Sequence, residues 1–120
     1  MSPKKNKYVK KSMISEMLFG EEKYVEEFSQ ASIQSFKEFS DNYANSLLDR
    51  DLESLRKAGH KIKPVAQMLN LQPILDEYEE AKVMLEEEES DAELQSSAAK
   101  IEKLCKQIIN DFTEIINEIK

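Results

Sequence analysis

The sequence is poor in the residues that form tight turns and metal centres. Its 120 residues include only two glycines and three prolines, no tryptophan, one cysteine and one histidine. So few turn formers disfavour a fold built of β-hairpins, whereas the abundant Glu, Lys, Leu and Ile favour helices. The single cysteine excludes an internal disulfide, and a single histidine is too few for a typical zinc site. We therefore expect an all-α protein that holds no metal and no cofactor.

Positive charge is in the minority, and it is unevenly placed. The formal net charge of -7 argues against general nucleic-acid binding. From Arg50 to Lys63, however, five Lys or Arg residues face only two acidic residues. From Asp76 to Glu93 ten acidic residues face one lysine, which is typical of a solvated helix face. The only histidine, His60, lies within the basic segment.

Long apolar runs are also missing. No stretch near the first residues resembles a signal peptide or a membrane span, so we expect a cytoplasmic protein without membrane contact. Residues 1–11 are rich in lysine and almost devoid of apolar side chains. We expect them to form a flexible basic tail, and residues 12–120 to form one domain with a single core.

Apolar residues at helical spacing are the main feature that the sequence does contain. This spacing predicts a short helix around residues 13–18, a long helix from Glu21 to about Leu48, a third helix after Asp51, a fourth from Pro73, and a last helix after the sequence Ser90-Asp91-Ala92-Glu93. Four long amphipathic helices with short connections predict an antiparallel four-helix bundle with a short N-terminal capping helix. We expect a monomer.

An oligomeric coiled coil built on the last helix is the alternative architecture. The apolar residues of that helix alternate at spacings of four and three, which is the pattern of a coiled-coil seam. The other helices carry complementary apolar faces that can cover this seam within one chain. Cys105 lies in the same apolar pattern, so we expect it to be a buried core residue rather than a nucleophile.

The third predicted helix places His60 on its water-facing side. Its apolar stripe passes through Leu55, Gly59 and Ile62. Successive residues of a helix turn by about 100°, so His60 points about 160° away from Ile62. Helical side chains lean toward the N-terminus, which puts Lys63 and Pro64 above the histidine. An exposed histidine by itself is usually an ordinary surface residue, so its neighbours decide the interpretation.

Those neighbours favour chemistry with a negatively charged group. The Lys63 ammonium can stabilise a phosphoryl group through charge-assisted hydrogen bonds, and Arg56 and Lys57 add positive potential one turn earlier. Pro64 has no long side chain to cover the imidazole, although a proline inside a helix costs about 3 kcal/mol. We expect it to bend the helix without breaking it. The sequence contains no Ser-His-Asp or Cys-His signature and no glycine-rich phosphate loop, which leaves an exposed nucleophilic imidazole in a basic patch.

This stretch resembles the histidine-containing phosphotransfer (HPt) domains of multistep two-component signalling. The family's pattern is a histidine, an apolar residue two later, a lysine three later, a glycine four later, and a leucine-glycine pair near the helix end. Here these positions are His60, Ile62, Lys63, Pro64 and Leu69-Asn70. The order of the predicted helices fits as well, so the resemblance covers the chain from about residue 14 onward. Because Asn readily adopts the left-handed conformation of a helix end, we predict a positive φ at Asn70.

The resemblance implies a phosphorelay function. His60 would accept a phosphoryl group from an aspartyl phosphate on a receiver domain of a hybrid sensor kinase or response regulator, and pass it to an aspartate on another receiver. Lys63 would stabilise the group, magnesium would belong to the receiver, and the chain would have no kinase activity of its own. The expected docking face comprises Glu53, Arg56, Lys57, Pro64 and Gln67 around the histidine. The alternative is a non-catalytic helical adaptor, including a pseudo-HPt protein that binds receivers without phosphotransfer.

Overall fold

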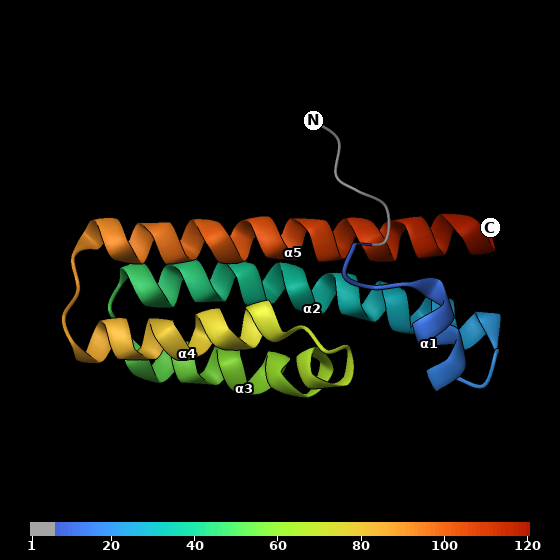
Figure 1. Ribbon diagram of the computed structural model, residues 1–120, viewed down its shortest axis with the longest axis horizontal. Coiled ribbons are helices and arrows are strands. Elements are labelled where there is room, and N and C mark those ends of the chain that lie inside the picture. The colour runs from blue at the N-terminus through green and yellow to red at the C-terminus, as the bar shows by residue number, and fades with distance from the viewer. Residues whose placement is uncertain (1–6) are drawn as a thin grey trace. The chain divides into compact units, whose positions relative to one another are not determined.

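The computed structural model describes residues 7–120, and over that range it contains five helices and no strand (Figure 1). The helices are α1 (Lys11–Met17), α2 (Glu22–Leu48), α3 (Leu52–Met68), α4 (Gln72–Glu86) and α5 (Asp91–Ile119). The all-α prediction is confirmed, with each helix close to the position that its apolar period indicates. Within residues 7–120, none of the helices combines the length and apolarity needed to cross a bilayer.

The chain divides into two compact units. The bundle unit is Glu38–Leu104, and the terminal unit combines Met1–Lys37 with Cys105–Lys120. Both α2 and α5 contribute residues to each unit. The bundle unit holds the last part of α2, all of α3 and α4, and the first part of α5, which are the four members of the predicted four-helix bundle. The single domain expected over residues 12–120 stays a prediction.

A hydrogen-bonded cluster ties three helices together inside the bundle unit. The fully buried Tyr43 of α2 donates its hydroxyl to the backbone carbonyl of Glu77 on α4 at 3.1 Å. The same hydroxyl lies 2.7 Å from the Ser97 hydroxyl of α5, which donates to the Glu77 carboxylate at 2.7 Å. Buried polar groups are costly unless they are paired, so this cluster fixes which faces of α2, α4 and α5 meet.

In the terminal unit, a buried carboxylate holds the chain where it enters α1. Asp111 of α5 accepts the backbone N–H groups of Lys7, Tyr8 and Val9 at 3.1, 2.6 and 3.0 Å, and the Gln107 amide at 2.9 Å. Val9 is fully buried. Residues 7–9 belong to the stretch expected to form a flexible tail over residues 1–11, and their backbone groups are bonded to a residue about a hundred positions later. The flexibility of the tail stays a prediction. Residues 1–6 of that prediction lie outside the described residues.

The ends of α3 are set by residues that the sequence points to. The Asp51 side chain accepts the Ser54 backbone N–H at 3.0 Å, and this hydrogen bond is the main reason that the pKa of Asp51 lies below its ordinary value. At the other end Asn70 has a φ of 56°, which confirms the predicted left-handed conformation. The next N–H, of Leu71, donates back to the carbonyl of Ala66 at 2.8 Å. α4 then runs back along α3 (Figure 1).

Candidate functional site

α3 presents His60 to solvent, as its position on the helix predicts. The helix is continuous through Pro64, so the proline does not break it. Its buried side consists of Leu55, Ala58, Gly59, Ile62 and Ala66. His60 directly follows the buried Gly59 and is itself exposed. A turn of about 100° per residue is enough to carry the imidazole from the core side to the surface.

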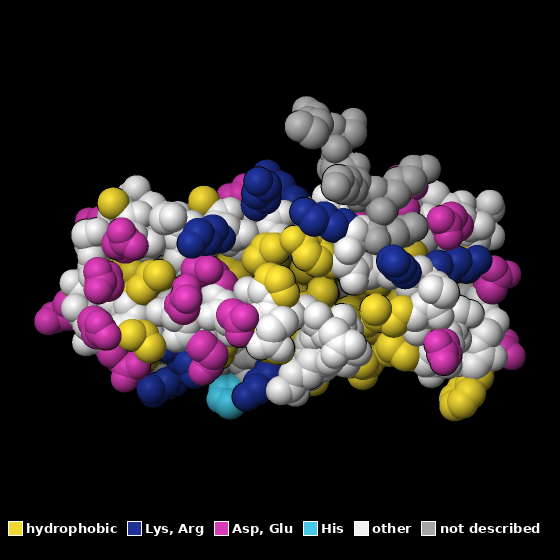
Figure 2. Space-filling view, viewed as in Figure 1, with side chains coloured by type: hydrophobic (Ala, Val, Ile, Leu, Met, Phe, Trp, Pro, Cys, Tyr) yellow, Lys and Arg dark blue, Asp and Glu magenta, His cyan; other side chains and the backbone are white. Residues whose placement is uncertain are grey.

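The residues expected to form a docking face are all exposed around the histidine. They are Glu53, Arg56, Lys57, Lys63, Pro64 and Gln67. Figure 2 shows the histidine side chain (cyan) at the surface with Lys or Arg side chains (dark blue) next to it. Because these residues are exposed on the same helix, one partner can contact all of them. Binding of a partner to this face stays a prediction.

Some of the cations in this region have acidic partners and others do not. Lys57 lies 3.9 Å from Glu53, and Arg50 pairs with Asp91 at 2.8 Å. Within residues 7–120, Arg56, Lys61 and Lys63 make no ion pair. Their charge is therefore not locally neutralised, and an anion that approaches His60 meets cations that are free to bind it.

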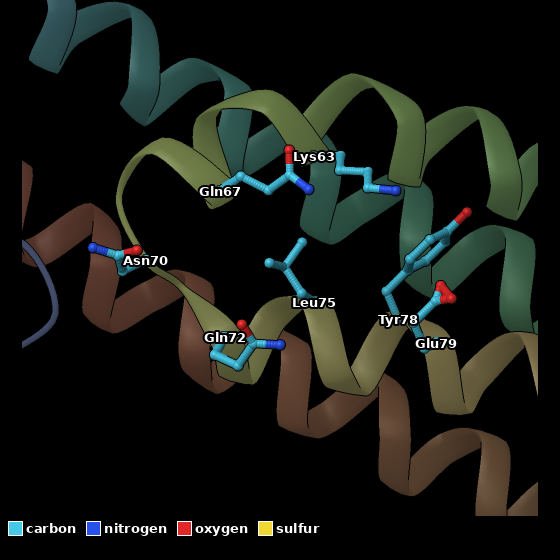
Figure 3. Close-up of a pocket in the computed structure, with 7 residues that line it drawn as sticks. All are labelled: Lys63, Gln67, Asn70, Gln72, Leu75, Tyr78 and Glu79. Carbon is cyan, nitrogen blue, oxygen red and sulfur yellow. The ribbon is translucent and has the colours of Figure 1, made fainter.

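An open pocket of about 340 Å³ lies between α3 and α4 (Figure 3). Its walls are Lys63, Gln67, Asn70, Gln72, Leu75, Tyr78 and Glu79. Two of these residues, Lys63 and Gln67 of α3, carry a predicted function, whereas no residue of α4 does. In Figure 3 the Lys63 side chain extends from α3 toward Tyr78, whose ring rises from α4 toward α3.

Tyr78 of α4 is a core residue that also contacts the helix that carries His60. The apolar spacing of the fourth predicted helix, through Ile74, Tyr78, Ala81 and Leu85, puts this tyrosine on the inner face, and in the structure only 8% of its surface is exposed. Its ring lies against the backbone of Gly59, so closely that a Cβ at position 59 would overlap the ring. A glycine inside a predicted helix stripe is a signal of close approach, and it could have pointed to a large partner side chain.

A lysine of α4 also contacts the Tyr78 ring. The Lys82 ammonium lies 4.8 Å from the ring centroid and pairs with Glu79 at 2.8 Å. The hydrogen bond to Glu79 is the main cause that raises the pKa of Lys82. Burial raises the pKa of the Tyr78 phenol above its ordinary value of 10.0, at which the hydroxyl is already protonated at neutral pH. We call Gly59, His60, Lys63, Tyr78 and Lys82 the α3/α4 seam.

Other chemistry in the described part of the chain is limited. Over residues 7–120 no group of three or more His, Cys, Asp or Glu side chains is arranged to hold a metal ion. Cys105 is buried, and burial raises the pKa of its thiol from 9.0 to about 12. A thiol in that state is a poor nucleophile, which agrees with its predicted place in the core. The imidazole of His60, by contrast, is exposed.

Comparison of the chain with protein-family models, with curated proteins and with solved structures gives no match. The resemblance to the HPt family therefore depends on the residues around His60 and on the order of the helices.

Proposed function

We propose that this chain is a phosphorelay intermediate whose acceptor is His60. The observation that carries the proposal is an exposed imidazole on a firmly capped helix, next to Arg56, Lys61 and Lys63, which lack acidic partners within residues 7–120. Unpaired cations beside a nucleophile favour a substrate that carries concentrated negative charge, and a phosphoryl group is such a substrate.

The proposed reaction is an exchange of one phosphoryl group between an aspartate and the histidine. A neutral ring nitrogen of His60 attacks the phosphorus of an aspartyl phosphate on a receiver domain, and the P–O bond to the aspartate breaks. The aspartate leaves as a carboxylate, and the new N–P bond holds the group on an imidazolium that can lose its remaining ring proton to water. Attack by a second receiver's aspartate reverses these changes and returns the neutral imidazole.

The α3 surface supports docking of a receiver around the histidine. Glu53, Arg56, Lys57, Pro64 and Gln67 are exposed along the same helix, so a partner that reaches His60 also reaches them. The Lys63 ammonium meets concentrated negative charge only when the phosphoryl group is present. We therefore expect this ammonium to accelerate the transfer more than it strengthens docking of the receiver. Magnesium in this scheme belongs to the receiver.

The test is transfer of label from phosphorylated receivers to the wild-type chain and to a His60→Gln variant. Glutamine keeps a polar, helix-compatible side chain at an exposed position but offers no nucleophilic ring nitrogen. We expect wild type to take the label, and His60→Gln to fold normally by circular dichroism and take none. Equal labelling of the two proteins would reject the acceptor role.

A non-catalytic adaptor is the second candidate, and one observation favours it. Pro64 replaces the glycine of the HPt pattern. A proline ring is bulkier than glycine, so a partner's backbone cannot come as close to α3 at this position. An adaptor of this kind would bind receivers without taking their phosphoryl group. Receiver binding by the wild-type chain without any label on His60 is the result that would favour it.

A further inference from the structure

The hydroxyl of Tyr78 lies beside the residue that precedes the proposed acceptor. A Cβ built on Gly59 would overlap three atoms at the far end of Tyr78, and one of them is the hydroxyl oxygen. Gly59 is followed directly by His60, so the phenol lies next to the helical turn that carries the imidazole. Any larger residue at position 59 would exclude the ring from this place.

This hydroxyl has no hydrogen-bond partner within residues 7–120, although most of the tyrosine is buried. The hydroxyl of Tyr43, in the same unit, makes two close polar contacts. The Tyr78 hydroxyl is not among the buried side-chain atoms that lack a partner, so it reaches solvent at the end of a largely buried ring. A hydroxyl that is held in position by its ring and open to solvent is available for a ligand.

The surroundings of the hydroxyl suit an anionic acceptor. Tyr78 and Lys63 line the same pocket from opposite helices (Figure 3). Lys82 lies over the ring. Burial raises the phenol's pKa and the nearby Glu79 carboxylate adds to this, whereas the positive charges of Lys82 and Arg56 act in the opposite direction. A phenol that keeps its proton among cations can donate a hydrogen bond to an oxygen that carries negative charge.

We propose that the Tyr78 hydroxyl donates a hydrogen bond to a non-bridging oxygen of the phosphoryl group as it is transferred to His60. This inference rests on the proposed function and adds to it a contact from α4. Lys63 from α3 and Tyr78 from α4 then hold the same group from two sides, and Lys82 and Gly59 position the phenol. A donor already fixed in place stabilises the transferring group without reorganisation at the moment of reaction.

The experiment uses phosphoramidate as a small phosphoryl donor, so that receiver docking does not affect the rate. A ring nitrogen of His60 attacks its phosphorus, the donor's P–N bond breaks, and ammonia leaves. We compare wild type with Tyr78→Phe, which keeps the ring, and with Tyr43→Phe, which removes a hydroxyl from the core of the same unit. The rate of His60 labelling and the ³¹P resonance of the labelled histidine are measured on the full chain.

We expect labelling of Tyr78→Phe to be about tenfold slower, as for loss of one hydrogen bond to a charged group. The ³¹P resonance should shift in this variant, while Tyr43→Phe keeps the wild-type rate and resonance. A wild-type rate and resonance in Tyr78→Phe, with wild type labelled on His60, would overturn the inference and leave the proposed function intact. Absence of label on wild-type His60 would overturn both.

A second variant covers the case in which Tyr78→Phe disturbs the packing of α4. Gly59→Ala places a methyl group where the ring lies, so it displaces the hydroxyl without removing it. We expect a similar loss of rate, with no further loss when the two substitutions are combined. Losses that multiply in the double variant would show that Gly59→Ala acts independently of the hydroxyl, which would count against the inference.

Discussion

The interior of the bundle unit and the α3/α4 seam use the same kind of residue in opposite ways. In the interior, Tyr43 has both its ring and its hydroxyl engaged, through the polar contacts with Glu77 and Ser97. At the seam, the ring of Tyr78 is held by Gly59 and Lys82, but its hydroxyl is unpaired within residues 7–120. A paired hydroxyl specifies which helices meet, whereas an unpaired hydroxyl in a fixed position can serve a ligand.

The lysine and arginine side chains around the seam also divide into paired and unpaired groups. Lys82, Arg50 and Lys57 each have an acidic partner, so part of their charge is already neutralised. Lys63 and Arg56 have none in the described part of the chain. The seam therefore contains both kinds of group, some that hold it together and some that remain available for an anion. Substitutions in the two regions should separate the loss of stability from the loss of transfer.

The largest effect at the seam, short of replacing His60 itself, should come from Lys63→Ala. An ammonium bonded to a phosphoryl oxygen contributes about 1.5–3 kcal/mol, so we expect transfer to be about 10- to 100-fold slower. Lys63 is exposed and makes no ion pair within residues 7–120, so the melting temperature should hardly change. Rapid-quench kinetics with a phosphorylated receiver measure the rate. Lys103→Ala, which removes an exposed lysine from α5, is the matched control, and equal rates in the two variants would contradict the assignment.

Tyr43→Phe should have the reverse effect. It removes the hydroxyl that contacts the Glu77 carbonyl and Ser97, and leaves those buried groups short of a partner. We expect the free energy of unfolding to fall by about 1–3 kcal/mol while phosphotransfer stays at the wild-type rate. Urea denaturation gives the stability. A variant that is as stable as wild type, or one that loses transfer in proportion, would show that the two regions are not separable in this way.

Stability at alkaline pH should depend on Cys105. Burial raises the pKa of its thiol in the folded state to about 12 from 9.0, so the folded chain keeps a proton that the unfolded chain releases. The stabilisation is complete below pH 9 and is lost as the pH rises toward 12. Between pH 8 and pH 10 wild type should lose about 1 kcal/mol more stability than Cys105→Ala does. Parallel losses in the two proteins would contradict the buried, neutral thiol.

The smallest effect should come from the edge of the docking face. Lys57 is exposed and lies 3.9 Å from Glu53, so its charge is partly balanced. Reversal by Lys57→Glu should weaken receiver binding by about two- to fivefold, chiefly through slower association. Lys103→Glu makes the same change of charge on α5, where no docking is expected, and should weaken binding less. Surface plasmon resonance with an immobilised receiver compares them, and equal losses would place the docking face elsewhere.

The helices and the exposed position of His60 could be predicted because they follow from local rules. Apolar spacing gave the five helices, Asp51 marked a helix start, and Asn70 marked an end with positive φ. Each of these features depends on residues a few positions apart. The prediction that His60 faces water needed only the turn per residue and the position of the buried stripe.

The missed features all depend on partners that are distant in sequence. The Asp111 carboxylate binds backbone groups about a hundred residues earlier, and Tyr43 contacts Ser97 across 54 positions. Periodicity shows which side of a helix is buried, but it does not show which polar group lies opposite. For the same reason, periodicity could not predict the contact between Tyr78 and Gly59, because this contact depends on how α3 and α4 pack. Gly59 was the one local sign of that contact.

The central claim is that His60 carries the phosphoryl group, and the most direct measurement is the chemistry of the label on the intact chain. After incubation with a phosphorylated receiver, peptide mapping by mass spectrometry should find phosphate on His60. The label should survive alkali and be lost in acid, as expected for an N–P bond, and it should be absent from His60→Gln. A label on another residue, or one that resists acid as a phosphoserine does, would contradict the account.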